Sequence, residues 1–569
     1  MSEKNVIGNI AKLFSASPSH RPQGVIIYGI DLGTTYSAVA YIDENGKAQI
    51  IPNSEDDRLT PSVVYFDENS NVIVGKLAGE AAKTDPSRVV EFVKRQMSGN
   101  WTFTADGRTY SPEEISAFIL KRLAEDAAKT GEHEVKNVVI TVPAYFGDKE
   151  RTRTRIAGEL AGLNVIEILD EPVAAALNYG LNTDDVRGKN ILVYDLGGGT
   201  FDATVVNFGE NPDKNEISVI CTEGNHQLGG KDWDDRIVNY YLLEFHLHTG
   251  STMSVAVDPD VMLELRQNAE IDKKVLSVKS NIKRKVAIEG KKTIVELTRD
   301  KFEELTADLL NQTLMLTDKV IKQANEKGYK TLDALILVGG SSRMPQIKEA
   351  IAARYHLTPG KNLVEFDIDE AVAKGAARAG EIKLLSYLVA DKAKKPLDEL
   401  PPEEQKKVVS QVAVITGKSK EEISTLPTLK KIATKSYGIK AAKGGNDIIR
   451  NLIIKQTPVP AAGWEEFITQ SANSRKLNLV VYINDESEQD TELKTSEQLG
   501  SIVFPLDGTL PAGAPIGVTF TLDEEGSLYL TGFDKTKGNK IEAVFRSNGI
   551  MSEGEKDAAK ANLDNKKIE

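Results

Sequence analysis

Two acids and three glycines stand together at residues 195–202, in the sequence DLGGGTFD. The apolar run 190–194 before them predicts a strand that delivers Asp195 into a tight turn. Because glycines have no Cβ, the backbone N–H groups of such a turn can close on a phosphate, while Asp195 and Asp202 are suited to a divalent cation or its waters. A single glycine turn after a strand is common, so this one does not establish a site by itself.

The same device occurs earlier in the chain as GIDLGTT, residues 29–35, after a predicted strand at 25–28. A third glycine turn begins at Gly339, after the predicted strand 334–338 and before a predicted helix at 345–355. The repeated pattern predicts two related lobes that close on one nucleotide from opposite sides. The sequence contains no GxxxxGK[ST] pattern, so the chain is not a P-loop nucleotide enzyme.

Strands and helices alternate around these turns, as in an α/β protein. The predicted strand 165–169 delivers Asp170 and Glu171 to a helix start, where α/β proteins place chemistry and where an acid also serves as an N-cap. Residues 88–98 have a helical period and carry Lys94, which only its context can assign to a site. Polar residues on one face of a later predicted helix face either water or a ligand: Glu270, Lys273, Lys274 and Ser277.

Composition bounds the function. The 569 residues are 40% hydrophobic and 27% charged, which is typical of a soluble protein with several domains. The net charge of -13 argues against a general binder of nucleic acid or anionic membranes. One cysteine, Cys221, cannot form an internal disulfide, and six histidines give no Cys/His metal cluster by spacing. We expect a cytoplasmic protein, because no secretory leader pattern or long apolar stretch occurs.

The later part of the chain has a different pattern. Short alternating strands predict a β-sandwich, at residues 451–455, 464–469, 476–483, 516–522 and 527–532. Between the two regions, residues 392–435 carry Pro401-Pro402 at a helix start, Gly417 as a stop and a capping box from Ser419 to Glu422. This insert predicts a helical hairpin packed on a neighbour, with partner docking as the alternative.

Several blocks of the sequence, in order, resemble the ATPase domain of the DnaK-type chaperones, the heat-shock-seventy family: IYGIDLGTTYS, VITVPAYFGD, DEPVAAALNYGL, VYDLGGGTFD, HQLGGKDWDDR, ILVGGSSRMP and DEAVAKGAA. The resemblance implies a two-lobed actin-like ATPase domain, and it resumes near Tyr437 with a β-sandwich for extended peptides. The implied order is an N-terminal tail at 1–25, the ATPase domain at 26–383, a linker with the inserted hairpin at 384–435, the β-sandwich at 436–548 and a charged tail at 549–569. The family's helical lid has no counterpart in this sequence.

The resemblance also implies a set of site residues. Those that would cradle the phosphates are Gly33, Thr34, Thr35, Tyr36, Gly197, Gly198, Gly199 and Thr200. Asp31, Asp195, Asp202 and Glu171 would position magnesium, its waters and the attacking water, with Asp31 and Asp195 holding the metal largely through water, and Lys94 would face the γ-phosphate. Further nucleotide contacts would come from Gly229, Gly230, Glu270, Lys273, Lys274, Ser277, Gly339, Gly340, Ser341, Arg343 and Asp369.

Two further sets follow from the resemblance. Ile439, Phe467, Leu477 and Leu479 match apolar groove positions, although each of them fits a plain core equally well. Pro143 and Arg151 match the family's relay between the nucleotide and the partner domain. Lys274 departs from the family, which usually has an arginine that stacks on adenine, so nucleotide affinity is expected to be lower.

These features predict an ATP-dependent chaperone that binds exposed apolar segments of unfolded proteins, with ATP, ADP and magnesium as ligands. A J-domain co-chaperone and a nucleotide exchange factor are the expected partners. One alternative is a nucleotide-loaded scaffold in which hydrolysis hardly matters, and another is a small-molecule kinase, which leaves the β-sandwich unexplained. The segment 384–391 fits both a docking linker and an extension of the preceding helix.

Overall fold

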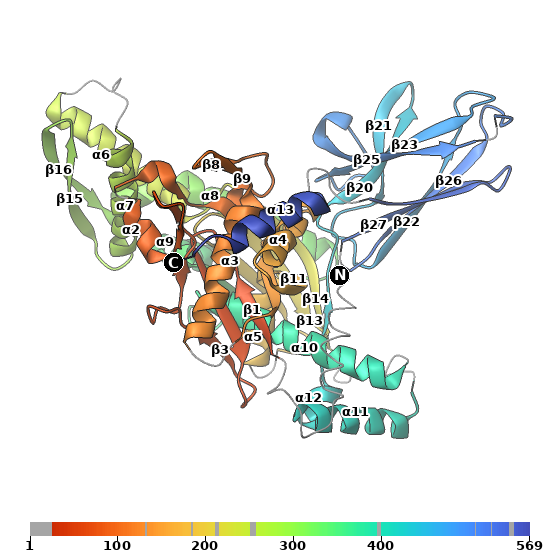
Figure 1. Ribbon diagram of the computed structural model, residues 1–569, viewed down its shortest axis with the longest axis horizontal. Coiled ribbons are helices and arrows are strands. Elements are labelled where there is room, and N and C mark those ends of the chain that lie inside the picture. The colour runs from red at the N-terminus through yellow and green to blue at the C-terminus, as the bar shows by residue number, and fades with distance from the viewer. Residues whose placement is uncertain are drawn as a thin grey trace.

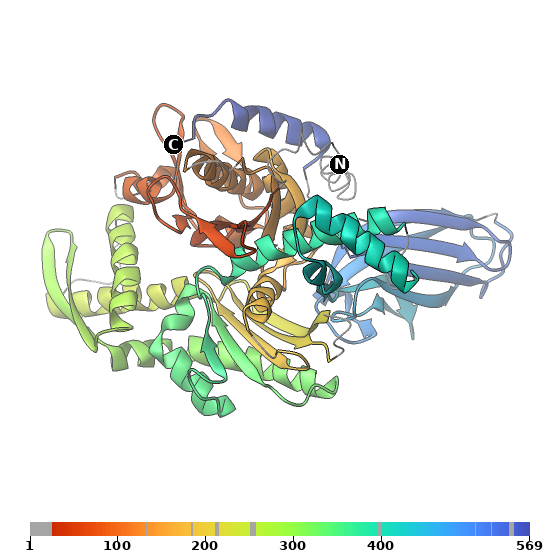
Figure 2. The same ribbon diagram turned by 90° about the horizontal axis from the view of Figure 1, so that it is seen from below.

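The structure is a computed structural model with mixed α/β content (Figure 1). It describes residues 26–82, 84–130, 134–183, 186–210, 216–250, 258–394, 400–506, 508–524, 526–545 and 551–568. The N-terminal tail predicted at 1–25 lies outside these residues. Below, "N-terminal unit" denotes residues 26–181, "central unit" residues 190–365 and "β unit" residues 436–545. Figure 2 shows the first two units side by side, with the β unit beyond one end of both.

The N-terminal unit is built on a six-stranded sheet with the order β11-β10-β1-β2-β3, to which β4 adds by pairing with β2. Its strands are β1 (Ile27–Asp31), β2 (Tyr36–Ile42), β3 (Ala48–Ile51), β4 (Thr60–Pro61), β10 (Asn137–Val142) and β11 (Asn164–Asp170). The helices α3 (Pro112–Lys129) and α4 (Asp148–Leu160) pack together and share a hydrophobic cluster with this sheet. A smaller sheet joins β5 (Val64–Phe66), β6 (Val72–Val74) and β7 (Val89–Val90).

The central unit has a second six-stranded sheet, in the order β18-β17-β12-β13-β14-β19. Its strands are β12 (Asn190–Leu196), β13 (Phe201–Phe208), β14 (Glu216–Asn225), β17 (Ala334–Val338), β18 (Leu363–Glu365) and β19 (Thr428–Lys430). Its helices are α6 (Gly230–Thr249), α7 (Pro259–Leu276), α8 (Arg299–Glu326) and α9 (Pro345–Tyr355). The hairpin β15 (Asn281–Ile288) and β16 (Lys291–Thr298) extends from this unit beside α6 (Figure 1). In both sheets, the strand that leads into an Asp-Leu-Gly turn, β1 or β12, pairs with a parallel strand on one side and an antiparallel strand on the other.

Two helices join the sheets. Helix α5 (Glu171–Leu181) and helix α10 (Ala371–Ala393) pack on each other, and both belong to a cluster that contains residues of each sheet. Gly375 makes this close approach feasible, because a Cβ there would lie 1.8 Å from the Ala174 carbonyl oxygen. The two units therefore share one buried seam.

Helix α10 decides between the two readings of residues 384–391. It continues without a break to Ala393, and Leu384, Leu385, Leu388 and Val389 are buried on its inner face. The segment is thus an extension of the helix, not a linker, and the domain boundary predicted after residue 383 falls inside a helix. The i, i+4 spacing of the apolar residues gives this helix a face that must be covered.

The inserted segment supplies that cover. Helix α11 (Pro402–Thr416) packs on α10 and buries Val408, Val409 and Val412, and Gly417 ends it in the left-handed conformation. The capping box predicted at Ser419 and Glu422 is present and opens the short helix α12 (Lys420–Ser424). After α12 the chain forms β19, which pairs in parallel with Glu216–Ser218 of β14 and adds an edge strand to the central sheet.

The β unit contains a five-stranded sheet, β24-β21-β20-β23-β25, and a four-stranded sheet, β22-β26-β27-β28. Their main strands are β20 (Ser436–Lys443), β21 (Asn446–Ile453), β22 (Ala461–Ile468), β23 (Lys476–Asn484), β25 (Ser496–Pro505), β26 (Pro515–Leu522), β27 (Leu528–Asp534) and β28 (Lys540–Phe545). Buried residues of both sheets form one hydrophobic cluster around Phe504 and Phe520. Alternation of buried and exposed positions along β22 and β27 matches the pattern read from the sequence.

Two expectations were wrong or incomplete. Residues 88–98 form no α-helix: Val89 and Val90 pair with β5, and Phe92 takes a left-handed conformation (φ 57°) before the short 3-10 helix η3 (Val93–Gln96). The charged tail at 549–569 is not a plain tail, because its described part contains helix α13 (Glu553–Asp564), which packs on α3 and α4.

Candidate functional site

A cavity of 980 Å³ opens between the N-terminal and central sheets. Its wall is built from the turn after β1, η3, the start of α5, the turn after β12, α7 and the turn after β17. Most of the site residues expected from the sequence line it: Asp31, Gly33, Thr34, Thr35, Tyr36, Lys94, Glu171, Asp195, Gly197, Gly198, Thr200, Glu270, Lys273, Lys274, Ser277, Gly339, Gly340, Ser341, Arg343 and Asp369. Gly199, Asp202, Gly229 and Gly230 are not part of this wall, but they support it.

The two glycine turns of the cavity touch each other. The Gly33 N–H donates to Ser37 Oγ at 3.2 Å in the first turn, and the Gly197 N–H donates to the Thr200 carbonyl at 3.0 Å in the second. A Cβ at Gly199 would lie 2.3 Å from Thr34 Cγ2. Any side chain there would therefore push the turns apart, which explains why glycine is required.

The second glycine pair holds the second turn from behind. The Gly230 N–H donates to the Gly197 carbonyl at 3.0 Å, and the Lys231 N–H donates to the Gly198 carbonyl at 2.8 Å. A Cβ at Gly229 would lie 2.4 Å from the Gly199 carbonyl carbon. The N-terminus of α6 is thus fixed directly on the turn, which places a positive helix end near the cavity.

Four carboxylates converge below these turns. Asp195 and Asp202 stand opposite each other on β12 and β13, Asp31 ends β1, and Glu171 begins α5. Burial, and after it the nearby Glu171 carboxylate, raises the pKa of Asp31 to about 7. Burial and Glu171 likewise raise the pKa of Asp195 and of Asp202 well above the usual range. The ionised forms of these carboxyl groups are therefore disfavoured by burial and by one another.

Lys94 is the cation that faces this cluster. Its Nζ forms an ion pair with the Glu171 carboxylate, and their side chains are only 5% and 8% exposed. The same lysine lowers the pKa of Asp31 and Asp195 electrostatically, against the larger effect of burial. A buried lysine held this way is preorganised to meet charge in the cavity.

Arg95 and Asp232 support the second turn, and sequence reasoning missed both. Arg95 Nε donates to the Gly199 carbonyl at 2.7 Å, and its guanidinium pairs with Asp232 at 2.6 Å. The Asp232 carboxylate in turn accepts the Gly229 N–H at 2.7 Å. The misassigned helix at 88–98 concealed this role, because only the turn at Phe92 directs Lys94 and Arg95 to different partners.

At the outer part of the cavity, α7 meets the N-terminal unit. Lys274 Nζ lies 5.4 Å from the centre of the Tyr36 ring and 2.7 Å from Glu270. Lys273 Nζ is buried deeper and donates to the Gly230 carbonyl at 2.8 Å, while also pairing with Asp234. Burial raises the pKa of Asp234 to about 6, although Lys273 opposes the shift. Asp234 was not expected from the sequence, although it lies within the block HQLGGKDWDDR.

The predicted relay residues Pro143 and Arg151 lie around the turn that follows β10 and the start of α4. Arg151 Nε donates to the Phe146 carbonyl at 2.9 Å, and the Arg151 guanidinium forms an ion pair with Asp170, the residue before Glu171. The Pro143 carbonyl accepts the Phe146 N–H at 3.1 Å, which fixes the turn that follows β10. These contacts connect the start of α4 to the start of α5.

The four apolar residues assigned to a groove lie in the β unit, far in sequence from the cavity. Ile439 and Leu479 are 2% and 4% exposed and belong to the cluster shared by its two sheets. Phe467 and Leu477 are half-buried and pack against that cluster.

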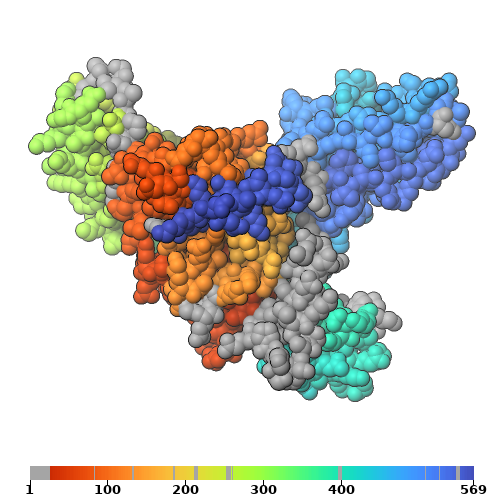
Figure 3. Space-filling view, viewed as in Figure 1, coloured from red at the N-terminus to blue at the C-terminus, as the bar shows by residue number. Residues whose placement is uncertain are grey.

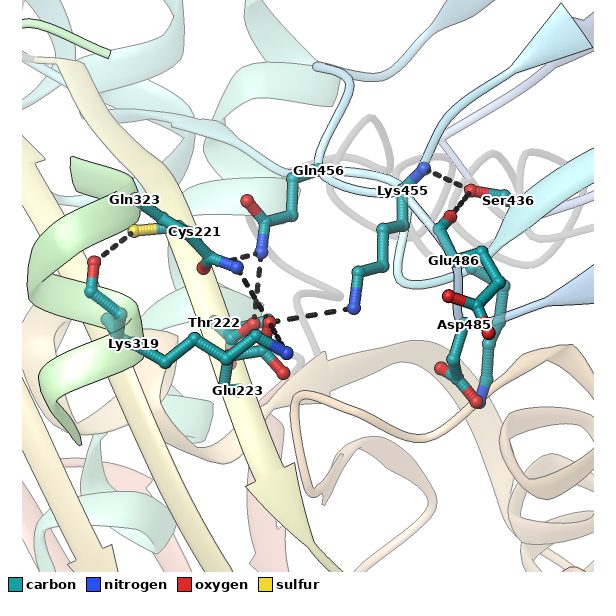
Figure 4. A network of polar contacts seen from close by, with 12 residues as sticks. Cys221, Thr222, Glu223, Lys319, Gln323, Ser436, Lys455, Gln456, Asp485 and Glu486 are labelled. Carbon is teal, nitrogen blue, oxygen red and sulfur yellow. Dashed lines mark hydrogen bonds and ion pairs between the residues drawn. The ribbon is translucent and has the colours of Figure 1, made fainter. Parts of the chain in front are cut away.

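A polar network connects the β unit to the central unit (Figure 4). Glu223, at the end of β14, pairs with Lys319 of α8 at 3.0 Å and with Lys455 of the β unit at 3.5 Å. Gln456 Nε2 donates to Gln323 Oε1 at 2.9 Å and to the Thr222 carbonyl at 3.3 Å. Because Glu223 and Lys455 have only 10% exposed side chains, this contact is a largely buried interface.

The family model described as "Hsp70 protein" matches residues 27–391. This range covers both six-stranded sheets up to β18 and nearly all of α10. Within the described residues, no helix is long and apolar enough to cross a membrane.

Proposed function

The chain belongs to the Hsp70 family, and from that premise we propose that it is an ATP-dependent molecular chaperone that binds exposed apolar peptide segments. Membership implies an actin-like ATPase fold and a chaperone-type function that depends on ATP binding. The observation that carries the proposal is the cavity between the two sheets, where glycine turns, four carboxylates and Lys94 converge. We propose two lobes that close on the nucleotide and a β-sandwich that binds peptide.

The cavity suits phosphoryl transfer to water, which needs positioning and charge neutralisation more than covalent help. The glycine turns at Gly33 and Gly197–Gly199 would hold the phosphates by backbone N–H groups. Lys94 would meet charge that develops on the γ-phosphate, while Glu171 and Asp202 would orient the attacking water. Glu270, Lys273 and Ser277 of α7, with Ser341 and Arg343, would hold the adenosine.

Magnesium fits the carboxylate cluster. Asp31 and Asp195 are buried, and burial followed by the neighbouring carboxylates raises the pKa of both, so a bound cation would favour their ionised forms. Within the described residues, no group of three or more His, Cys, Asp or Glu side chains is arranged as a direct metal site. We therefore propose that Asp31 and Asp195 hold magnesium largely through its waters. When bound, the metal would neutralise phosphate charge.

Coupling between ATP and peptide is the finer part of the proposal. Arg151 and Asp170 connect the catalytic Glu171 to α4, and Glu223 connects β14 to Lys455 of the β unit. Both contacts lie between the nucleotide cavity and the β unit. Ile439, Phe467, Leu477 and Leu479 would form the peptide groove once the cluster around them opens. We expect a J-domain co-chaperone and an exchange factor as partners, and a cytoplasmic location.

The test is ATP turnover by the full chain with and without a short apolar peptide. A coupled chaperone hydrolyses ATP to ADP and free phosphate faster when peptide is present. Turnover that ignores the peptide would instead favour a nucleotide-bound scaffold. Phosphate transferred to an added small molecule rather than to water would identify a kinase.

A further inference from the structure

Helix α13 lies across the N-terminal unit and packs on α3 and α4, although the strands that precede it in the sequence belong to the β unit. In Figure 3 it forms a continuous ridge over the surface of residues from the first part of the chain. Its inner face carries Ala559 and Leu563, which are 3% and 1% exposed and belong to the main hydrophobic cluster of the N-terminal unit. Met551 packs against the same cluster. The helix is thus part of that core, although it stands more than 380 positions after α4 in the chain.

The residues after α13 continue the attachment as extended chain. Ile568 is buried and forms a parallel bridge with Val72 of β6, and the Val72 N–H donates to the Lys567 carbonyl at 3.0 Å. Lys566 Nζ donates to the Ser70 carbonyl at 2.6 Å. The segment is therefore attached in two ways, by an amphipathic helix packed on α3 and α4 and by one β-bridge to β6.

Polar contacts fix the direction of the helix on the groove. A capping box of Ser552 and Glu555 opens it. Lys556 Nζ contacts Glu159 of α4 at 3.5 Å near its start, and Lys121 of α3 donates to the Leu563 carbonyl at 3.2 Å near its end. A cation at the last carbonyls of a helix also complements the helix dipole. The reversed orientation would place like charges together and leave these carbonyls without Lys121.

From these contacts we infer that the face formed by α3, α4 and β6 is a binding site for residues 551–568, and that this segment is a second anchor of the β unit. The first anchor is β19, which precedes the β unit and pairs with the central sheet. The chain from Phe545 to Met551 spans at most about 20 Å when fully extended. As long as α13 is bound, the β unit cannot leave the N-terminal unit by more than this distance. The chain that enters the β unit is thus attached to the central unit, and the chain that leaves it is attached to the N-terminal unit.

The test compares Leu563→Asp with the matched variant Ala561→Asp in the full chain. Both place an aspartate on α13, but Leu563 is buried and Ala561 is exposed. Hydrogen exchange at the Val72 amide reports binding of the segment, and exchange at the Leu429 amide reports β19. For Leu563→Asp we expect the exchange rate at Val72 to rise about ten- to a hundredfold, because the burial of one leucine side chain is lost. We expect the exchange rate in β19 to rise as well. Ala561→Asp should change neither.

Two outcomes would overturn the inference. Unchanged protection of Val72 in Leu563→Asp would show that the segment does not depend on this groove. Loss of protection at Val72 with unchanged exchange in β19 would show that α13 covers the N-terminal unit without anchoring the β unit.

A second experiment tests the same contact with a peptide, after circular dichroism and thermal unfolding have shown that a chain without residues 551–569 is folded. A chain that lacks residues 551–569 should bind a synthetic peptide of residues 551–568, and the peptide should restore protection at Val72. The intact chain should not bind the peptide, because its own segment fills the groove. Equal binding of the peptide to both chains would contradict the proposal.

Discussion

The nucleotide cavity and the apolar positions of the β unit differ in how their residues are satisfied. In the cavity, charged side chains from separate elements line one open space, and burial followed by neighbouring carboxylates raises the pKa of Asp31 and Asp195. In the β unit, Ile439 and Leu479 are buried in the hydrophobic cluster that the two sheets share. A cluster of buried charged residues around a cavity points to a ligand site, whereas buried apolar residues in a shared core do not by themselves reveal a groove.

This difference predicts opposite responses to substitution. Substitutions of cavity residues should affect function with little loss of stability, if these residues hold ligand as proposed. Apolar residues of the β unit should affect stability in proportion to their burial, and function only where some surface remains exposed.

The largest effect on function is expected from Lys94→Ala. ATP should still bind, because the glycine turns and Arg343 are untouched, but hydrolysis should fall about a hundred- to a thousandfold, the cost of one preorganised donor. Single-turnover hydrolysis with a separate nucleotide-binding measurement checks this. Lys76→Ala is the matched control, because Lys76 lines the cavity with a 63% exposed side chain. Equal rates for the Lys94 variant and the parent chain would remove Lys94 from the reaction.

The next effect separates core from groove within the β unit. Leu479→Ala should destabilise this unit by about 2–5 kcal/mol through lost burial and a cavity. Phe467→Ala should cost less stability, because Phe467 is half-buried, and should weaken peptide binding more than it lowers the melting temperature. Thermal unfolding and binding of a labelled apolar peptide would be measured on both variants. If Leu479→Ala left the melting temperature unchanged and abolished peptide binding, the expectation that buried residues of the β unit act through stability would be wrong.

A smaller effect is expected from Gly229→Ala. The new Cβ would meet the Gly199 backbone at 2.4 Å, so the second turn must shift and ATP should bind about tenfold more weakly, roughly 1.4 kcal/mol. Gly79→Ala is the control, since nothing lies within 4 Å of its Cβ position and it sits in helix α2 (Lys76–Ala81). The free energy of unfolding of the Gly79→Ala variant should rise by about 0.5–1 kcal/mol. Calorimetric titration with ATP distinguishes the two, and equal affinities would show that the turn tolerates the shift.

The smallest effect concerns the contact between the two regions. Lys455→Ala removes one partner of Glu223 and should reduce peptide stimulation of ATP turnover about two- to fivefold, with basal turnover unchanged. Lys319 still pairs with Glu223, which limits the loss. Lys440→Ala, at an exposed ion pair of the same unit, should leave stimulation intact. If both variants behave like the parent, coupling does not pass through this network.

The sequence predicts the local features of the site better than the contacts between distant segments. The turns around Gly33 and Gly197 and the helix start at Glu171 depend on local patterns, and the structure has them where we expected. The supports of the site do not: Arg95 reaches Gly199 and Arg58 reaches Glu370 only after distant segments have packed. No local spacing encodes such pairs.

The wrong prediction for residues 88–98 and the open alternative for residues 384–391 have physical causes. Residues 88–98 have a helical period, but pairing of Val89 and Val90 with β5 outweighs it, as β-branched residues favour. For residues 384–391 an apolar linker and an apolar helix face share the same composition. Packing of α11 on α10 covers the apolar face of the helix, which favours the helical conformation.

The docking of the β unit also has a consequence for solubility. Strand β14 is nearly an edge strand, and edge strands with unpaired carbonyls are templates for aggregation. Here β19 pairs with residues 216–218, Lys327 donates to the Ile220 carbonyl at 2.6 Å, and Gln456 donates to the Thr222 carbonyl at 3.3 Å. Of these contacts, only that of Gln456 comes from the β unit. Undocking of the β unit would therefore uncover the Thr222 carbonyl at the end of this edge, and the time that the units remain apart would set how long this carbonyl is exposed to self-association.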